Sequence, residues 1–366
     1  MAGTGSSPFA ASYPEARQKF LEAAADAGVA VEAKAHPLPG LHDELLAMDV
    51  ARDGHPNAQR LLILSSACHG VEGFCGSGVQ VAMLRDAAWR AKAAENGVAV
   101  LYVHGLNPYG FSHIRRTTHE NVDLNRNFHD FSQPLPVNAA YRDVHPLLVP
   151  EEWPPDAANE QAIMGYIAKV GERAYQAAVS GGQYAFDDGL FYGGRSPTWS
   201  NLAIREVLRT HGRRAARIGW IDVHTGLGPS GVGERIFAGR DDPASLSRAR
   251  RWWGGADGKG VTSIYDGSST SALLSGLMFT AVYDECPQAE YTGMALEYGT
   301  VPVMESFQAL RAEQWLTAHP DAPKEKADAI RRQVWNAFYT DTDAWRERIL
   351  AQAREALSQA VEGLAA

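Results

Sequence analysis

The chain is expected to fold as an α/β protein in which a mixed, mostly parallel twisted sheet is flanked by helices. Apolar runs at 61–67 and 98–103 have the length and composition of buried strands, and the segment between them, near 76–94, has helical character. A third apolar run at 218–223 follows a helical segment near 200–212. Strands that alternate with helices pair in parallel through right-handed crossovers, so these segments predict the centre of such a sheet.

The first elements of the chain are a helix and two strands. Residues 13–27 are amphipathic, and Gly28 is suited to cap the end of a helix there. The segments near 29–36 and 44–52 alternate between apolar and polar residues at their centres, which is typical of strands. After the second buried strand, the Asn-Pro-Tyr-Gly sequence at 107–110 predicts a turn.

The middle of the chain contains less regular sequence. Residues 130–160 are rich in proline and charge and are expected to form a surface excursion. A helix is predicted near 158–180, followed by a loop at 181–194 because that segment is rich in glycine and aromatic residues. Further strands are predicted near 234–238 and at 294–298.

The last part of the chain, 325–366, is rich in alanine, arginine, glutamate and leucine and predicts one long helix or two, broken near 340–343. The sequence contains no evident internal repeat or linker. We therefore expect a single domain over 1–366, with a core at about 29–320 and a helical C-terminal tail.

Composition excludes several classes of partner. The net charge of −9, with dispersed acidic residues, argues against binding to nucleic acid or to an anionic membrane surface. No apolar run reaches the length of a membrane span, and residues 1–8 lack the features of a secretory signal. Cys68, Cys75 and Cys286 form no C-x-x-C pair, which suits a reducing compartment, so a cytoplasmic location is expected.

Four clusters of polar residues lie at or after the ends of predicted strands. They are His69 with Glu72, Arg116 with the segment 121–128, Asp222 with His224, and Glu297. Ligands of open α/β sheets bind outside the carboxyl ends of the strands, so we expect these side chains to converge. A histidine and a glutamate three residues apart are a weak signal alone, but the four clusters together contain the residue types that a hydrolytic zinc site requires.

These motifs resemble those of the zinc carboxypeptidase (M14) superfamily, especially its DUF2817 branch. The chain is also similar, more distantly, to the aspartoacylase and succinylglutamate desuccinylase group. The matching segments run in the family's order across about two thirds of the chain, at 69–72, 107–111, Arg116, 123–128, 222–226 and 296–299.

The resemblance implies one Zn²⁺ ion per chain, held by His69, Glu72 and His224 with a water molecule in the fourth position. His₂Glu is the ligand set of carboxypeptidase A, so it is the family's and is not worked out from this sequence. Glu297 would be the general base, and Arg116, rather than its neighbour Arg115, would stabilise the oxyanion.

The resemblance also implies how the substrate and the ligands are held. Asn125 and Arg126 would bind a carboxylate of the substrate, and Asp123 would accept a hydrogen bond from the ring of His69. Asp222 either supports the site or pairs with a nearby arginine. Both possibilities remain open at this point.

The aromatic loop at 189–201 is a candidate for the substrate pocket, which Phe191, Tyr192 and Trp199 could line, with Tyr192 as a substrate-binding residue. A packed loop without that role fits the sequence equally well. The family's digestive members supply a catalytic tyrosine from a mobile loop. Tyr265, Tyr283 and Tyr298 are all possible counterparts, and the sequence does not choose among them.

The function predicted is a zinc-dependent hydrolase that cleaves an amide bond in a small or short-peptide substrate with a free carboxylate, either a peptide or an N-acyl amino acid. Alternatives are a carboxypeptidase acting on longer peptides and a non-catalytic zinc-binding protein that retains the fold. A cysteine hydrolase that uses Cys68 with His69 is disfavoured, because adjacent residues at a strand end point apart. The native metal and the oligomeric state are left open.

Overall fold

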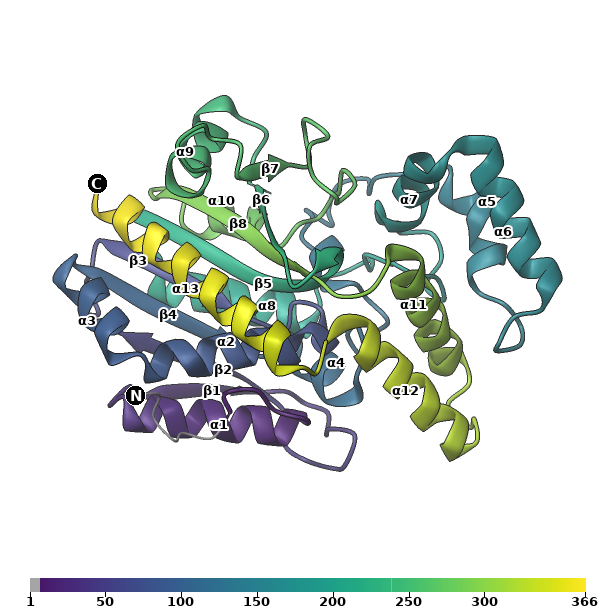
Figure 1. Ribbon diagram of the computed structural model, residues 1–366, viewed down its shortest axis with the longest axis horizontal. Coiled ribbons are helices and arrows are strands. Elements are labelled where there is room, and N and C mark those ends of the chain that lie inside the picture. The colour runs from purple at the N-terminus through teal and green to yellow at the C-terminus, as the bar shows by residue number, and fades with distance from the viewer. Residues whose placement is uncertain (1–6, 238) are drawn as a thin grey trace.

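The computed structural model describes residues 7–237 and 239–366. In these residues an eight-stranded sheet has the order β1-β2-β4-β3-β5-β8-β6-β7 (Figure 1). The strands are β1 (Val31–Ala35), β2 (Ala47–Asp53), β3 (Arg60–Ser65), β4 (Val98–His104), β5 (Arg217–Ser230), β6 (Gly233–Phe237), β7 (Val261–Ser263) and β8 (Glu290–Gly299). The central strands β4, β3, β5 and β8 are parallel, whereas β2 and β6 pair antiparallel to their inner neighbours. The predicted α/β class with a mixed sheet is confirmed.

Helices cover both faces of the sheet. They are α1 (Tyr13–Asp26), α2 (Gly73–Arg85), α3 (Ala87–Glu95), α4 (Pro108–His113), α5 (Tyr141–Leu148), α6 (Ala157–Val170), α7 (Glu172–Ser180), α8 (Trp199–His211), α9 (Pro243–Trp253), α10 (Thr280–Glu285), α11 (Val303–Ala318), α12 (Lys324–Phe338) and α13 (Asp343–Ala365). Side chains alternate along β3, so that Leu62 and Leu64 pack into one core with α1, α2 and α13. Leu61 and Ile63 pack into a second core with α8 and α10.

Two predicted helices are each interrupted once. The helix expected near 76–94 is divided into α2 and α3 at Asp86, whose carboxylate accepts a hydrogen bond from the backbone N–H of Trp89 and so caps α3. The helix expected near 158–180 is divided into α6 and α7 at Gly171, where φ is +89°. The break predicted near 340–343 is present between α12 and α13.

Other differences from the sequence-based expectation concern short or irregular segments. The turn predicted at 107–110 is the start of α4, capped by the side chain of Asn107, and the excursion at 130–160 contains α5. The strand expected near 234–238 is β6, and residue 238 of that prediction lies outside the described residues. Helices α9, α10 and α11 and strand β7 were not predicted. In the described ranges, no helix combines the length and apolarity that crossing a membrane requires.

Helices α5, α6 and α7 project to one side of the sheet, next to α11 (Figure 1). The buried side chain of Arg311 on α11 joins them, because its guanidinium donates hydrogen bonds to the carbonyls of Leu147 and Leu148 and to the side chain of Asn159. The indole N–H of Trp315 donates to the carbonyl of Glu151. This projection is therefore fastened to the helix that follows β8.

Helix α13 packs along the sheet and is part of its core (Figure 1). We expect Leu357→Ala, which removes a fully buried side chain of α13, to lower the free energy of unfolding by about 2–5 kcal/mol because it leaves a cavity. Glu347, an exposed residue of the same helix, provides the matched control, and Glu347→Ala should change the free energy of unfolding by less than about 0.5 kcal/mol. Urea unfolding of both variants tests this, and equal effects would show that α13 adds little to the core.

Candidate active site

Three neighbouring strands of the sheet deliver polar side chains to one edge. A single 3-10 turn, Gly70–Glu72, follows β3; His69 immediately precedes this turn and Glu72 is its last residue. This turn lies so close to α4 that a Cβ atom on Gly70 would fall 2.0 Å from the backbone of Gly110, so only glycine fits there. His224 on β5 and Glu297 on β8 are paired residues in the parallel register, which places them side by side.

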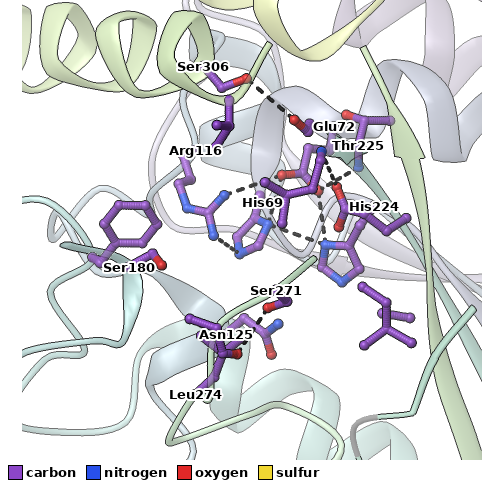
Figure 2. Close-up of a pocket in the computed structure, with 18 of the residues that line it drawn as sticks. His69, Glu72, Arg116, Asn125, Ser180, His224, Thr225, Ser271, Leu274 and Ser306 are labelled. Atoms are coloured by element: carbon purple, nitrogen blue, oxygen red, sulfur yellow. Dashed lines mark hydrogen bonds and ion pairs between the residues drawn. The ribbon is translucent and has the colours of Figure 1, made fainter. Parts of the chain in front are cut away.

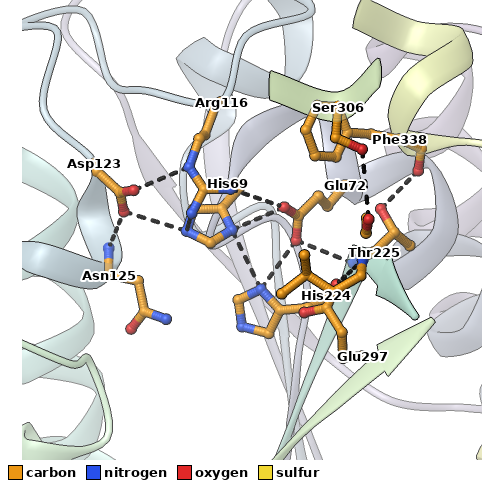
Figure 3. Close-up of polar contacts among 12 residues, drawn as sticks. His69, Glu72, Arg116, Asp123, Asn125, His224, Thr225, Glu297, Ser306 and Phe338 are labelled. Atoms are coloured by element: carbon orange, nitrogen blue, oxygen red, sulfur yellow. Dashed lines mark hydrogen bonds and ion pairs between the residues drawn. The ribbon is translucent and has the colours of Figure 1, made fainter. Parts of the chain in front are cut away.

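The side chains of His69, Glu72 and His224 converge within the buried interior of the site (Figure 3). The Nδ1 atom of His69 lies 2.9 Å from one carboxylate oxygen of Glu72, and the Nδ1 atom of His224 lies 2.9 Å from the other. The two Nδ1 atoms are 3.3 Å apart. Two imidazole nitrogens and a carboxylate aimed at one point form a donor set that Zn²⁺ accepts, so these residues fit a metal ion.

The outer ring nitrogens of both histidines face carboxylates. The Nε2 atom of His69 lies 3.2 Å from Asp123, and the Nε2 atom of His224 lies 2.7 Å from Asp222. The other oxygen of Asp222 accepts a hydrogen bond from the hydroxyl of Ser65. Asp222 therefore lies against His224, the position from which a carboxylate orients a ligating imidazole.

The surroundings of Glu72 and His224 favour the charged form of each of these two side chains. Burial raises the pKa of the Glu72 carboxyl, but His69 and His224 outweigh this effect and lower it overall. Burial lowers the pKa of His224, but Asp222 and Glu72 outweigh it and raise that pKa overall. Without a metal ion, the carboxylate of Glu72 and a protonated His224 therefore stabilise each other.

Glu297 lies next to this group and is nearly buried. One of its carboxylate oxygens accepts a hydrogen bond of 3.0 Å from the backbone N–H of Leu227. Burial, with the nearby Glu72 carboxylate, raises the pKa of Glu297 to about 8. A carboxyl group with that pKa exchanges protons near neutral pH.

The raised pKa predicts a pH dependence of stability for the metal-free protein. Glu297 releases its proton near pH 4.5 in the unfolded chain but near pH 8 in the folded protein. Its protonated form therefore contributes stability that is fully present below pH 4.5 and is lost as the pH rises to about 8. The free energy of unfolding should therefore fall across this interval more steeply in the wild type than in Glu297→Gln. Urea unfolding in the presence of a chelator measures both slopes, and parallel curves would contradict the assignment.

Arg116 links His69 and Glu72 to Asp123 (Figure 3). Its Nε atom donates to Asp123 at 2.9 Å, its Nη2 atom lies 2.8 Å from the Nε2 atom of His69, and its Nη1 atom lies 3.4 Å from Glu72. Arg116 also lines the cavity described below. The neighbouring Arg115 is engaged elsewhere, with Glu313 and Thr117.

Asn125 and Arg126 also line the cavity. The side-chain oxygen of Asn125 accepts a hydrogen bond from the backbone N–H of Met278, which leaves its amide group as a donor. The guanidinium of Arg126 donates three N–H groups to the carbonyls of Ser180 and Asn125. Two of its five N–H groups remain available to a ligand.

Tyr192 is not brought to the cavity with the other predicted residues. It is buried, and its carbonyl accepts a hydrogen bond from the backbone N–H of Asp123. The adjacent Phe191, also expected at the pocket, does line the cavity, whereas Trp199 does not. The ring centroid of Phe191 lies 4.9 Å from the guanidinium carbon of Arg116 and 5.7 Å from that of Arg126. Phe191 has φ +53°, an uncommon value for a residue other than glycine, and the sequence carries no signal of it.

The three candidate tyrosines point elsewhere. The hydroxyl of Tyr265 donates to the carbonyl of Gly239, and that of Tyr298 donates to the carbonyl of Ile349. The hydroxyl of Tyr283 accepts a hydrogen bond from the backbone N–H of Arg240. Among the described residues, no tyrosine lines the cavity.

One cavity has largely apolar walls (Figure 2). Its polar lining includes His69, Glu72, His224, Glu297, Arg116, Asn125 and Arg126. The wall next to Asn125 is formed by residues of the β6–β8 region, namely Ile236, Ile264, Leu274, Leu277, Phe279 and Ala295. A second wall is formed by α11 and by the end of α12. Its residues, none of which was predicted from the sequence, are Val303, Ser306, Phe307, Leu310 and Phe338.

Comparison with known proteins assigns the chain to a family. Residues 9–352 match the model of the family described as "Protein of unknown function (DUF2817)". The chain belongs to this family. The DUF2817 membership predicted from the motifs is thereby confirmed, and no curated protein matches the DUF2817 chain.

The fold of the DUF2817 chain is similar to solved structures at low sequence identity. Bovine thrombin-activatable fibrinolysis inhibitor, solved in complex with tick carboxypeptidase inhibitor, has a TM-score of 0.51 and 10% identity, covering 98% of this chain and 99% of that chain. Carboxypeptidase A from Helicoverpa armigera has a TM-score of 0.46 and 13% identity over 89% of this chain and 73% of that chain. A metallo-carboxypeptidase from Burkholderia cenocepacia has a TM-score of 0.42 and 13% identity, covering 88% of this chain and 66% of that chain. The first similarity supports the predicted carboxypeptidase-like fold of the DUF2817 chain.

Proposed function

We propose that the protein is a zinc-dependent hydrolase that cleaves an amide bond in a small substrate with a free carboxylate, either a peptide or an N-acyl amino acid. One observation carries the proposal. Two imidazole nitrogens and a carboxylate converge at the head of a cavity that also contains Glu297 and two arginines. This combination meets the needs of amide hydrolysis, which requires a water nucleophile, a proton carrier and cationic groups near the developing charge.

His69, Glu72 and His224 would hold one zinc ion per chain. When bound, zinc lowers the pKa of a coordinated water to about 7 and polarises a carbonyl group. Asp222 would keep the proton of His224 on its outer nitrogen and leave its Nδ1 atom free to ligate. Asp123 would do the same for His69 once Arg116, which can only donate and lies 2.8 Å from that outer nitrogen, turns toward the substrate.

Glu297 would move the proton. The N–H of Leu227 fixes one of its oxygens, and the carboxylate accepts a proton from the attacking water before delivering it to the leaving nitrogen. A cation held by Glu72 would offset the charge that helps to raise the pKa of Glu297, and so would favour the carboxylate form that accepts the proton.

The cationic side chains would bind the substrate. The free amide of Asn125 and the two remaining N–H groups of Arg126 would receive its carboxylate. Arg116 would face the carbonyl of the scissile bond. The apolar wall beside Asn125 favours substrates whose adjacent side chain is also apolar.

A cysteine nucleophile is less well supported. Cys68 is buried, and burial raises the pKa of its thiol well above the usual value, so the thiolate is disfavoured. Cys68→Ser should therefore retain activity that a chelator abolishes.

The proposal is tested by metal analysis of the purified protein and by a panel of N-acyl amino acids and short peptides, each paired with its C-terminal amide. We expect about one zinc per chain and hydrolysis of the free acids at least about 100-fold faster, because the amides cannot form charge-assisted hydrogen bonds with Arg126. A protein that binds zinc but hydrolyses no member of the panel would instead be a zinc-binding protein without this activity.

A further inference from the structure

The wall formed by α11 and the end of α12 lies across the metal-binding residues from Asn125. Figure 2 shows Ser306 of α11 on one side of His69, Glu72 and His224, with Asn125 and Leu274 on the other. Because the proposed function places the substrate carboxylate at Asn125 and Arg126, the acyl side of the scissile bond would extend toward α11. The inference below rests on that proposed function.

This wall is attached to the strands that carry the reactive side chains. The hydroxyl of Thr225, next to His224, donates to the carbonyl of Phe338 at 2.6 Å, and the hydroxyl of Thr300 donates to the carbonyl of Ala337 at 2.6 Å. The ring of Phe338 lies over Gly226, where an added Cβ atom would fall 2.9 Å from it and 3.9 Å from the carboxylate of Glu297. The wall is therefore a fixed part of the site.

The chemistry of the wall is apolar. Val303, Phe307, Leu310 and Phe338 line it, and the ring of Phe307 meets that of Phe191 edge to face, at 6.4 Å between centroids. Its polar side chain, Ser306, already donates a hydrogen bond to the carbonyl of Gly226. Among the described lining residues, the carboxylates are Glu72 and Glu297, which the proposed reaction uses.

Charge then discriminates between two kinds of substrate. A dipeptide with a free α-amino group would place an ammonium against these apolar side chains without a carboxylate of its own, and burying an unpaired charge is costly. An uncharged acyl chain or aromatic acyl group would instead gain from burial, at roughly 25 cal/mol per Å² of apolar surface.

We propose that α11 and the end of α12 form an acyl-binding pocket, and that the substrate is an N-acyl amino acid whose acyl group is apolar and uncharged, rather than a peptide with a free amino group next to the scissile bond. The reaction is hydrolysis of that amide. Water adds to the carbonyl, the C–N bond breaks, and a carboxylic acid and a free amino acid are released.

The test compares N-octanoyl-, N-acetyl- and glycyl-L-leucine as substrates of the zinc-loaded wild type. We expect kcat/KM to rise by at least about tenfold from acetyl to octanoyl, and glycyl-leucine to be at least about 100-fold poorer than the octanoyl compound. Phe307→Ala should raise KM for N-octanoyl-leucine about tenfold more than it raises KM for N-acetyl-leucine, since the longer acyl chain loses more apolar contact. Met304→Ala, on the same helix outside the cavity lining, is the matched control.

Binding gives a readout that does not depend on turnover. Calorimetry with the ketomethylene isosteres of N-octanoyl- and glycyl-leucine should show the same preference in Kd, and Phe307→Ala should reduce it. Faster hydrolysis or tighter binding of the glycyl compound would overturn the acyl-pocket proposal while leaving the hydrolase intact. Hydrolysis of none of the three, by a zinc-loaded and folded protein, would instead count against the proposed function. Because the comparison is made first in the wild type, it stands even if Phe307→Ala does not fold.

Discussion

Glu297→Gln should lower kcat/KM for any hydrolysed substrate by about 10³-fold, within the range typical of removing a general base. Glutamine has the same shape and can still accept the hydrogen bond from the N–H of Leu227, but it cannot take a proton from water. The three proposed metal ligands are unaltered, so the zinc content should stay near one per chain. The measurement is steady-state kinetics alongside metal analysis of the same preparation.

A glutamate on the same strand provides the control for this variant. Glu290 is exposed at the start of β8 and pairs with Arg217 and Arg248 near the surface. Glu290→Gln should therefore leave kcat/KM within about twofold of the wild type. If Glu297→Gln retained comparable activity, Glu297 would not be the proton carrier.

Removing a metal ligand should have the second large effect. We expect His224→Ala to weaken zinc binding by more than about 100-fold, because even residues that only orient a ligand contribute 10- to 100-fold. Hydrolysis should be lost with the metal. The measurement is zinc affinity by competition with a chromogenic chelator, together with circular dichroism to show that the variant is folded.

The exposed His42 supplies the comparison for His224. It lies in the loop between β1 and β2, so His42→Ala should bind zinc as the wild type does. If His224→Ala still bound one zinc with the affinity of the wild type, His69 and Glu72 would have to recruit another ligand, and the metal centre proposed above would be wrong.

The centre of the fold was predictable because its signals are local. The strands β3 and β4 and the first half of β5 are short apolar runs, and parallel strands place their carboxyl ends at one edge, so His69, His224 and Glu297 were expected to converge although they lie far apart in the chain. The end predicted for the third strand was wrong, because β5 continues past His224 to Ser230, and Glu297 likewise lies within β8.

The walls of the site were not predictable in the same way. Helix α11 was missed because its buried and exposed residues do not form a clear amphipathic pattern, since much of one half is enclosed by neighbouring elements. Composition points equally to Phe191 and Tyr192, so the sequence offers no basis for naming Tyr192 as the substrate-binding residue. The choice depends on the backbone at Phe191, where φ of +53° directs the ring toward Arg116. That conformation is imposed by contacts from Gln183 and Asp123 to this loop, which only the folded chain shows.

The attachment of Phe338 to Thr225 has a consequence for biosynthesis. All of the proposed metal ligands emerge from the ribosome long before the segment that closes the cavity above them. Before α12 and α13 are synthesised, a nascent chain would have His69 and His224 at an open edge of the sheet. The apolar face of β3 and β5 would then still lack the cover of α13. Completion of the cavity is therefore expected late in synthesis, after the last helices of the chain have docked.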